Sequence, residues 1–563
     1  MPATFKSLVH LLENIEATKK RLEIIDATAN YIQTLNPEEV EAAADMMVGR
    51  GFPKHSQKTL GINWSTLTYT FEHITGPGWK TLLRQAMAAT GDIGSAAKIA
   101  LEKSQTKKQT QLTQTALTIT EVQNAFESIA QAQGPKSRTR KERLLVALLS
   151  RAEPVEVKYL VKIFTGEMRT GLHEGLMEQA VARAFGVPLI RVQHAAMVLG
   201  DIGEVAFVLK SRGMKGLESA EFQVFRPVKL MLAQTAQNVE EALKEHSGES
   251  AFEYKYDSAR VQIHKQGDRV EIFSRRLSDV TASLPEVVKT VKANLQAESA
   301  IVEGEVIAFD SIGYPIVFQH LMRRFRRTRG VSGFAKKMPI TLYLFDILYL
   351  NEESLITKSY LERRKILAET AGTIALSKQI VSDKLETVEG FLKEALATGH
   401  EGLMAKKLDS PYTPGRRGKR WLKIKTTLEP LDLVITAAEY GYGRRKGWLS
   451  DYYLAARDQE SGEFWDIGKT FKGLTDAEII ELTGRLKESA VSEGTHKVVV
   501  IPKIVVEVAY NEIQQSPRYR SQMALRFARI TRIREDKSPQ EASTIGQVRE
   551  IFDRQFRTKG KYP

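Results

Sequence analysis

The spacing of apolar residues changes twice along this chain, and the changes limit what it can fold into. Through most of the N-terminal part, apolar side chains recur at helical spacing and strand-like alternation is scarce. From Arg226 the pattern is mixed, and after Leu428 it becomes short strands between glycine-rich turns. The sequence therefore predicts a multidomain protein with an all-α domain over residues 1–225, an α+β domain over 226–427, and a small β-barrel with a helical tail over 428–563.

Some single elements can be predicted inside these domains. Residues 252–275 alternate as a hairpin that turns at Gly267. Residues 341–350 form a continuous apolar run, which predicts a buried strand, and residues 388–397 are expected to form a helix. In the last domain, the predicted strands cover residues 431–437, 450–456 and 497–509.

A Gly-Asp-Ile-Gly element occurs twice, at residues 91–94 and 200–203, each time followed closely by Ala and other apolar residues. The repeat suggests two related helical halves. Glycine caps between helices would give the same pattern without any such relationship. Between the copies, residues 103–118 are rich in Lys, Gln and Thr, which predicts an exposed loop.

The 563 residues suffice for about three or four domains and carry a formal net charge of +14. Such a charge favours a polyanionic partner, although a basic protein without one could have the same total. Basic residues cluster at residues 323–327, 416–425 and 518–534. This clustering indicates contact with a nucleic acid backbone.

Cysteine is absent, which excludes disulfides and thiolate zinc sites. The first residues mix charged and apolar side chains at helical spacing and lack the layout of a signal peptide. No apolar run approaches the ~18 residues that a membrane span needs. We therefore expect a cytoplasmic protein without membrane contact.

Lys255 stands between two tyrosines in an otherwise apolar segment, an unusual place for a charged side chain. A lysine amine can act as a nucleophile only without its proton, which a free lysine with a pKa of about 10.4 retains at neutral pH. A site that uses such a lysine must favour the neutral amine through partial burial and neighbouring cations. Arg260, Lys423 and Lys425 are candidates for those cations. A lysine on the surface of a strand is the alternative interpretation.

Further charged residues lie inside apolar segments. Glu303 and Glu305 share one strand face among Val and Ile residues; such pairs usually face solvent, but this setting indicates the edge of a pocket. Lys423 and Lys425 share a strand face beside Trp421, which fits a solvated surface poorly.

Together these segments resemble the ordered motifs of covalent nucleotidyltransferases, and specifically of ATP-dependent DNA ligases of the archaeal and eukaryotic type. Residues 252–260 resemble the Lys-x-Asp-Gly-x-Arg nucleophile motif, with Ser258 where the family usually has glycine. Residues 525–537 resemble the last motif of DNA ligases, with Ala528 where proline is common. The resemblance covers nearly the whole chain, and the remaining matching segments are residues 168–172, 199–203, 226–233, 301–307, 342–349, 401–406 and 412–425.

The resemblance implies a helical DNA-binding domain, an adenylation domain and a C-terminal OB-fold barrel that closes over a nick. It also implies three steps: Lys255 takes AMP from ATP and releases pyrophosphate, AMP passes to the 5′-phosphate of the nick, and the 3′-hydroxyl expels AMP. Mg²⁺ would neutralise the phosphates.

The same resemblance assigns roles to individual residues. At the nucleotide it places Glu253 beside the base, Phe345 stacked on it, Arg275 near the ribose or phosphates, Glu305 at the ribose or a metal ion, Glu401 at the metal ion, and Arg417, Lys423 and Lys425 at the phosphates. It makes Arg260 a further residue of the ATP or AMP site. It places Arg526 and Arg529 on the pyrophosphate side.

Several alternatives stay open. An RNA ligase or a capping enzyme would explain Lys255 but not the helical N-terminal domain. An NAD-dependent ligase is disfavoured because that class uses a cysteine zinc module. A non-catalytic scaffold that binds nicks is a different class of hypothesis, and Ser258 is the motif feature that favours it.

The expected partner is nicked duplex DNA, bound by a monomer associated with the nucleoid. Residues 107–112 occupy the place where archaeal ligases carry a sliding-clamp peptide, but they lack its closing aromatic pair, so clamp binding stays open. The strictness for ATP over ADP, GTP or NAD also stays open.

Overall fold

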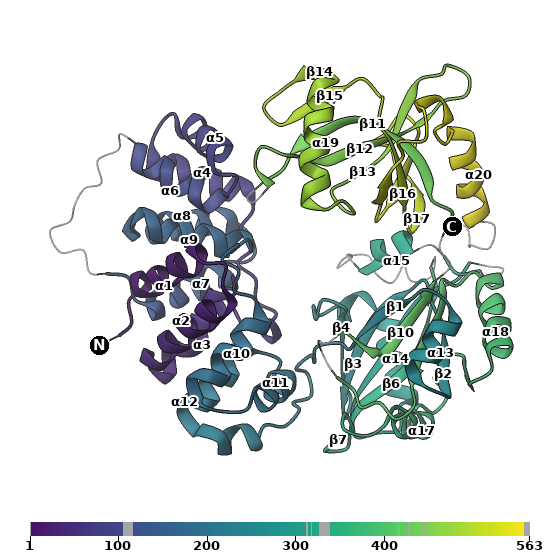
Figure 1. The fold of residues 1–563 in the computed structure, drawn as a ribbon. Coiled ribbons are helices and arrows are strands. Elements are labelled where there is room, and N and C mark those ends of the chain that lie inside the picture. The colour runs from purple at the N-terminus through teal and green to yellow at the C-terminus, as the bar shows by residue number, and fades with distance from the viewer. Residues whose placement is uncertain are drawn as a thin grey trace.

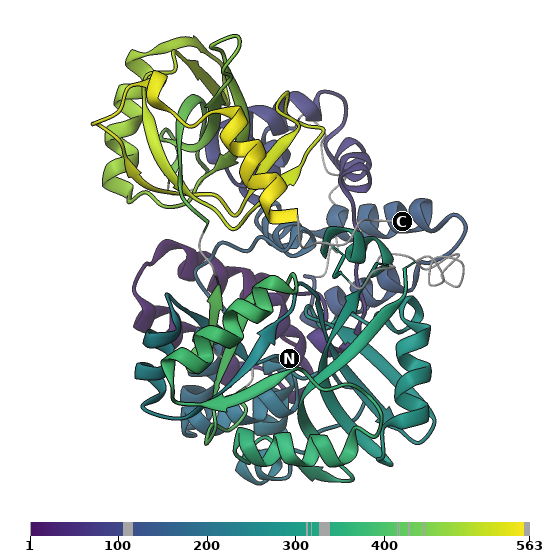
Figure 2. The ribbon, with the colours of Figure 1, turned by 90° about the vertical axis from the view of Figure 1, so that its right-hand side faces the viewer.

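The computed structural model describes residues 2–104, 116–310, 314–316, 318–325, 338–413, 415, 417–425, 428–442 and 445–556, and for residues 318, 319, 417 and 556 it describes the backbone only. The chain forms three lobes (Figure 1). A helical lobe runs along one side of the molecule, and two lobes that contain sheets lie one above the other on the opposite side. Figure 2 shows the same division from the side.

The N-terminal lobe is built of helices, and side-chain caps fix the starts of several of them. In α3 and α7, for example, the caps Asn36 and Thr118 form capping boxes with the glutamates three residues later, which satisfies free N–H groups of the first turn. Helices make up this lobe up to Glu218, which confirms the prediction of an all-α N-terminal region. Its helices are α1 (Phe5–Ala17), α2 (Arg21–Thr34), α3 (Pro37–Met47), η1 (Lys54–Ser56), α4 (Trp64–Thr75), α5 (Trp79–Thr90), α6 (Ile93–Lys103), α7 (Ile119–Gln131), α8 (Ser137–Arg151), α9 (Pro154–Thr165), α10 (Glu174–Phe185), α11 (Leu189–Val198) and α12 (Ile202–Glu218).

The two Gly-Asp-Ile-Gly elements have the same local structure. The first glycine of each copy has a positive φ, of 64° and 75°, and each aspartate caps the helix that follows, α6 or α12. The last glycine of each copy, Gly94 or Gly203, lies against a backbone carbonyl of another helix, where a Cβ would not fit. The glycine-cap interpretation is thus confirmed, and the shared geometry also agrees with two related halves.

Two five-stranded sheets form the middle lobe, with the orders β1-β10-β9-β2-β8 and β4-β3-β5-β6-β7. Helices α13 and α18 pack on the first sheet, and α14 and α17 pack on the second. Where the sheets meet, Phe345 and Trp421 share one apolar cluster. The elements are β1 (Leu232–Ala236), α13 (Val239–His246), β2 (Ser250–Lys255), β3 (Ala259–Gln266), β4 (Arg269–Ser274), η2 (Thr281–Ser283), α14 (Pro285–Asn294), β5 (Ser299–Ala308), α15 (Phe318–Phe325), β6 (Ile340–Leu350), β7 (Glu353–Ser354), α17 (Tyr360–Thr370), β8 (Gln379–Ser382), α18 (Leu385–Ala397), β9 (Gly402–Lys407) and β10 (Arg417–Lys425).

Residues 252–275 contain three strands and not one hairpin. Strands β3 and β4 form the predicted hairpin around Gly267, and β6 and α18 confirm the strand and the helix predicted further on. Strand β2, however, belongs to the other sheet. Apolar residues stand at positions 252, 254 and 256 and then at 259, 261 and 263, so the alternation shifts by one position where the chain changes sheets. The hairpin prediction did not use this shift.

The C-terminal lobe is mainly β-structure with two helices. One sheet has the order β13-β12-β11-β15-β14, β16 pairs with β11 and β19, and β17 and β18 form a separate hairpin. No closed barrel is found among the described residues. Residues 497–509, predicted as one strand, form β15 and β16, because Pro502 between them offers no N–H to a ladder. The elements are β11 (Leu431–Tyr440), β12 (Leu449–Arg457), β13 (Phe464–Thr470), α19 (Asp476–Glu488), β14 (Ala490–Glu493), β15 (Lys497–Val500), β16 (Val505–Ala509), β17 (Glu512–Gln515), β18 (Met523–Arg526), β19 (Arg529–Ile533), η4 (Pro539–Glu541) and α20 (Ile545–Phe556).

In the described part of the chain, no single helix is long and apolar enough to cross a membrane. Helices α11 and α12 together reach such a length and composition, but a bend of 115° separates them. Most of the exposed loop predicted over residues 103–118, namely residues 105–115, lies outside the described residues, and so does the clamp peptide considered at residues 107–112.

Candidate active site

Lys255 is the last residue of β2, where the chain leaves the first sheet. It lies opposite Gly402 of β9, and Gly402 in turn lies opposite Lys425 of β10. Because Gly402 has no side chain, the two lysine side chains can converge across it. Both ammonium groups contact the same carboxylate oxygen of Glu401, whose backbone N–H donates to the Lys255 carbonyl oxygen at 2.9 Å. The sheet thus brings three of the predicted site residues together.

Burial and the neighbouring lysines shift the pKa of Glu401 in opposite directions. Burial alone would raise the pKa of Glu401, but Lys255 and Lys425 outweigh it and hold the pKa at about 2. The carboxylate therefore stays ionised at neutral pH. Burial also lowers the pKa of Lys425, and the positive charge of Lys255 lowers it further. Two ammonium groups around one carboxylate form a site suited to an anionic ligand.

Glu253 lies on the same face of β2 as Lys255 and in register with Lys423 across β9. Its carboxylate is buried and pairs with the Lys406 ammonium at 2.7 Å. It also accepts hydrogen bonds from the hydroxyl of Tyr360 and, at 3.2 Å, from the amide of Gln379. These three partners hold the Glu253 carboxylate in one position at the site.

Arg260 projects from β3 of the second sheet. Its guanidinium pairs with Glu303 at 2.8 Å and donates to the backbone carbonyl of Met231 at 2.8 Å. Tyr412 donates to the other carboxylate oxygen of Glu303 at 2.9 Å. Burial raises the pKa of Glu303, although Arg260 opposes that shift. Arg260 is therefore held in place by the buried carboxylate of Glu303. The sequence instead suggests Arg260 as a cation that acts on Lys255.

Phe345 is buried between the sheets with 5% of its surface exposed. Its ring lies edge-on to Trp421 at 6.2 Å, with the guanidinium of Arg260 at 5.2 Å and the ammonium of Lys406 at 4.4 Å from the ring centroid. These contacts leave little of the Phe345 ring open to a ligand.

Glu305 accepts a hydrogen bond of 2.7 Å from the hydroxyl of Ser258. Burial raises the pKa of Glu305, while Ser258 and Arg260 lower it. Ser258 does not have a positive φ, so the backbone there does not need the glycine that the resemblance would place at this position. The serine found there instead restrains a predicted site carboxylate.

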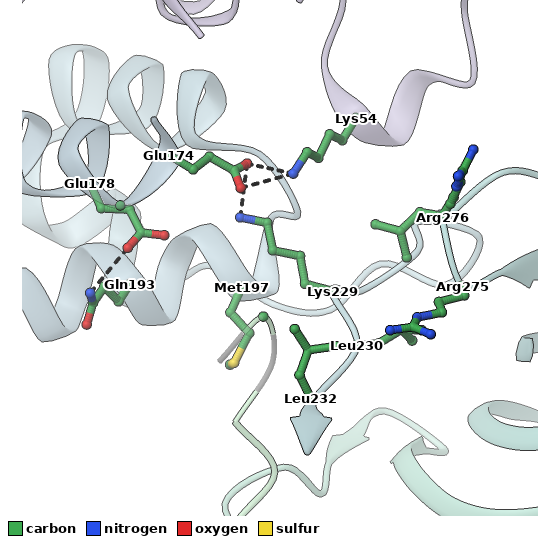
Figure 3. Close-up of a pocket in the computed structure, with 13 residues that line it drawn as sticks. Lys54, Glu174, Glu178, Gln193, Met197, Lys229, Leu230, Leu232, Arg275 and Arg276 are labelled. Atoms are coloured by element: carbon green, nitrogen blue, oxygen red, sulfur yellow. Dashed lines mark hydrogen bonds and ion pairs between the residues drawn. The ribbon is translucent and has the colours of Figure 1, made fainter. Parts of the chain in front are cut away.

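Arg275 lies away from this cluster, in a cavity of about 510 Å³ between the helical and middle lobes (Figure 3). In Figure 3, Lys54 and Lys229 both point at Glu174, at 2.9 Å and 3.2 Å. Burial would raise the pKa of Glu174, but these two lysines hold it at about 2. Arg276 lines the same cavity.

The remaining predicted residues lie elsewhere or cannot be fully described. The side chain of Arg417 lies outside the described residues, while its backbone pairs with Leu232 of β1. Arg526 and Arg529 belong to the C-terminal lobe, which Figure 1 shows above the middle lobe. Arg526 pairs with Glu512 at 3.3 Å in that same lobe.

Sequence reasoning did not single out Lys406 or Tyr412, although both lie inside segments that match the motifs. The side chain of Lys406 is 2% exposed and lies 4.5 Å from the centre of the Trp421 ring. One signal was available: Lys406 follows a run of apolar residues on β9, where an unpaired charge would be costly. Its partner Glu253 lies 153 positions earlier in the chain, so the pairing could not be predicted from local sequence pattern.

Comparison with known protein families gives three matches in chain order. Residues 4–182 match the model described as DNA ligase N terminus, residues 230–425 match the ATP dependent DNA ligase domain, and residues 445–537 match the ATP dependent DNA ligase C terminal region. The chain therefore belongs to the ATP-dependent DNA ligase family.

Full-length relatives agree with this assignment. A DNA ligase of Thermococcus fumicolans is 42% identical over 99% of this chain and 100% of its own length. DNA ligase 1 of Korarchaeum cryptofilum is 44% identical over 98% of this chain and 99% of its own length. A solved structure titled Pmar-Lig_PreS3 shares the fold, with a TM-score of 0.58 at 16% identity over 94% of this chain and 99% of that chain.

The protein is thus a DNA ligase that seals nicks with ATP. An RNA ligase, a capping enzyme or a non-catalytic scaffold is not favoured, because all three ligase models match along the chain.

Proposed function

We propose that Lys255 is the nucleophile that takes AMP from ATP. The observation that carries this proposal is the convergence of the Lys255 and Lys425 ammonium groups on the Glu401 carboxylate at the end of β2. In the reaction, the neutral amine of Lys255 bonds to the α-phosphorus, the bond from that phosphorus to the pyrophosphate oxygen breaks, and the amine loses a proton. Lys423 and Lys425 would hold the α-phosphate, as cations on one face of β10.

Glu401 would orient the amine and would not remove its proton. A carboxyl group with a pKa of about 2 is a weak base at neutral pH. Its hydrogen bond to Lys255 instead fixes the direction in which that side chain points. The proton of Lys255 would therefore pass to another acceptor, such as solvent.

The base end of the nucleotide would lie toward Glu253 and Phe345. Glu253 is fixed there by Lys406 and Tyr360, so its position is set before the nucleotide binds. Stacking on Phe345 would compete with the contacts that Arg260 and Lys406 make with its ring. We infer that the Arg260 guanidinium then turns toward the ribose or phosphates, with Arg417 as a further phosphate ligand.

The magnesium ion would be held by Glu401 and Glu305 together with the phosphates of ATP. The described residues contain no group of three or more His, Asp or Glu that could hold a metal ion by itself. That arrangement fits magnesium, which commonly takes one or two carboxylates plus substrate phosphates. Bound there, the ion would neutralise charge that develops on the phosphates.

The wider assignments rest on the family match. We propose that the helical lobe, over residues 1–225, grips nicked duplex DNA, that residues 226–427 carry the adenylation chemistry, and that residues 428–563 act as an OB-fold. Arg526 and Arg529 would meet the pyrophosphate side of ATP. The enzyme would work as a monomer in DNA replication, repair and recombination, in the cytoplasm at the nucleoid.

Labelling with ATP that carries a radioactive α-phosphate tests the nucleophile. Lys255→Arg keeps a cation beside Glu401 but removes the amine, so no label should remain on the protein. Lys419→Arg is the matched control, because Lys419 lies on the first sheet but is exposed and pairs with Glu245 at 2.7 Å. Substantial labelling of Lys255→Arg would remove Lys255 from this role.

A further inference from the structure

A short turn of the helical lobe, residues 54–57, faces the middle lobe and the segment that leads into it. Lys54 shares the carboxylate of Glu174 with Lys229 of that segment. A ring nitrogen of His55 lies 3.0 Å from the guanidinium of Arg226, in the same segment. The turn is therefore one of the places where side chains of the helical lobe contact the middle lobe and the segment that leads into it.

Gln57, at the end of this turn, makes a two-point contact with the middle lobe. Its side-chain amide donates to the backbone carbonyl of Leu277 at 2.6 Å. Its side-chain oxygen accepts from the backbone N–H of Asp279 at 2.9 Å. An amide that both donates and accepts in this way fixes the distance and the orientation of the backbone that it holds.

The backbone held by Gln57 belongs to a tight turn with Arg275 and Arg276 at its tip. The N–H of Leu277 donates to the Ser274 carbonyl at 2.8 Å, and the N–H of Ser274 donates to the Ser278 carbonyl at 2.9 Å. Leu277 has a positive φ of 62°, which is unfavourable for a leucine. A conformation of this kind persists only where its surroundings hold it, and Gln57 holds the carbonyl of the same residue.

The position of this turn decides where two cations lie. Arg275 and Arg276 line the cavity of about 510 Å³ between the lobes, together with Lys54 and Lys229 (Figure 3). Lys54 and Lys229 are already paired with Glu174. The guanidinium of Arg275 is thus a cation whose place in the cavity depends on the turn that carries it.

We propose that Gln57 is a positioning residue for Arg275. Through the turn at residues 274–277, the helical lobe sets where the Arg275 guanidinium stands, and so contributes to the chemical steps in addition to gripping DNA. This inference rests on the proposed ligase chemistry in one respect, namely that Arg275 acts near the ribose or phosphates of the nucleotide, as the resemblance to DNA ligases implies.

A double-mutant cycle tests the inference on the full-length enzyme. The variants are Gln57→Ala, Arg275→Ala and the two combined, with Gln131→Ala as the matched control, an exposed glutamine at the end of α7. Two rates are measured, self-labelling with ATP and sealing of a nick that already carries 5′-AMP. Gln57→Ala should slow the step that Arg275→Ala slows, by roughly three- to tenfold, the factor expected from one or two exposed hydrogen bonds.

The combined variant should be no slower than Arg275→Ala alone, because Gln57 then has no arginine to position. Gln57→Glu should behave like Gln57→Ala, since a carboxylate cannot donate to the Leu277 carbonyl. Melting temperatures and the rates of Gln131→Ala should match those of the unaltered enzyme.

Two results would overturn the positioning role of Gln57 without affecting the role of Arg275. One is a normal rate in Gln57→Ala or Gln57→Glu. The other is a combined variant that is slower than Arg275→Ala by the factor that Gln57→Ala causes on its own. Normal rates in Arg275→Ala would instead remove the nucleotide-binding role that the resemblance implies for Arg275, and this inference with it. None of these results would change the outcome of labelling Lys255→Arg, so a failure of the nucleophile assignment can be recognised separately.

Discussion

The hydroxyl of Ser258 holds one oxygen of Glu305 in a setting where burial opposes the ionised carboxylate. The family usually has glycine at this position, which cannot form such a bond. The serine therefore adds a restraint on Glu305 that a glycine could not provide. It gives no support to a decayed, non-catalytic site, because the neighbouring cluster of Lys255, Glu401 and Lys425 is complete.

Replacing Ser258 with alanine should change how self-labelling depends on pH. The Ser258 hydrogen bond lowers the pKa of Glu305, so its loss should raise that pKa further. At a given acidic pH, less of Glu305 would then be ionised, and the acidic limb of the rate profile should move to higher pH. The rate at neutral pH should fall only slightly. An unchanged limb, or one that moves to lower pH, would contradict the role given to Glu305.

At the scale of the strand, β9 makes the convergence of the two lysines possible. Gly402 has a φ of 139°, a conformation that side chains disfavour, and an added Cβ would overlap the carbonyl oxygen of Ile424. The strand thus needs glycine at the position that separates Lys255 from Lys425.

Gly402→Ala should destabilise the middle lobe by about 2–4 kcal/mol, from backbone strain together with steric overlap. A clearly lower melting temperature and slower self-labelling are the expected results. Gly418→Ala, in β10 of the same sheet, is the control, since a Cβ there would meet nothing within 4 Å. Equal stability of the two variants would show that the strand can adjust around Gly402.

Local pattern predicted which residues share a strand face but not which strands lie beside one another. The spacing of Lys423 and Lys425 placed both on one face, as the structure confirms for β10. The contacts of Glu253 with Lys406 and of Arg260 with Glu303 join strands far apart in the sequence, so only the folded sheet order reveals them. The shift of the apolar alternation between residues 256 and 259 marks the separation of β2 from β3, but it does not reveal which strands lie beside β2.

At the scale of the molecule, Arg526 and Arg529 belong to the C-terminal lobe, whereas Lys255 belongs to a sheet of the middle lobe (Figure 1). If these arginines meet the pyrophosphate side of ATP, the two lobes must act together in that step. Sequence pattern predicted three domains and their order. It did not predict the Gln57 contact or the cavity between lobes, which depend on how complete domains dock.

Replacing both arginines with alanine should cripple formation of the lysine–AMP adduct, because guanidinium groups stabilise charge on the departing pyrophosphate. Sealing of a nick that already carries 5′-AMP should suffer much less, once DNA binding is shown to be similar. A parallel loss of both activities would mean that the arginines hold DNA or stabilise their own lobe.

If Lys255 is the nucleophile, AMP becomes bonded to it, and the site of that bond can be measured directly. The unaltered enzyme is incubated with ATP and magnesium, cleaved at a pH that preserves a phosphoramidate, and its peptides are analysed by mass spectrometry with fragmentation. We expect the added mass of AMP on the peptide that contains Lys255, and at that residue within it. AMP found on Lys423, on Lys425 or on any other residue would show that Lys255 is not the nucleophile.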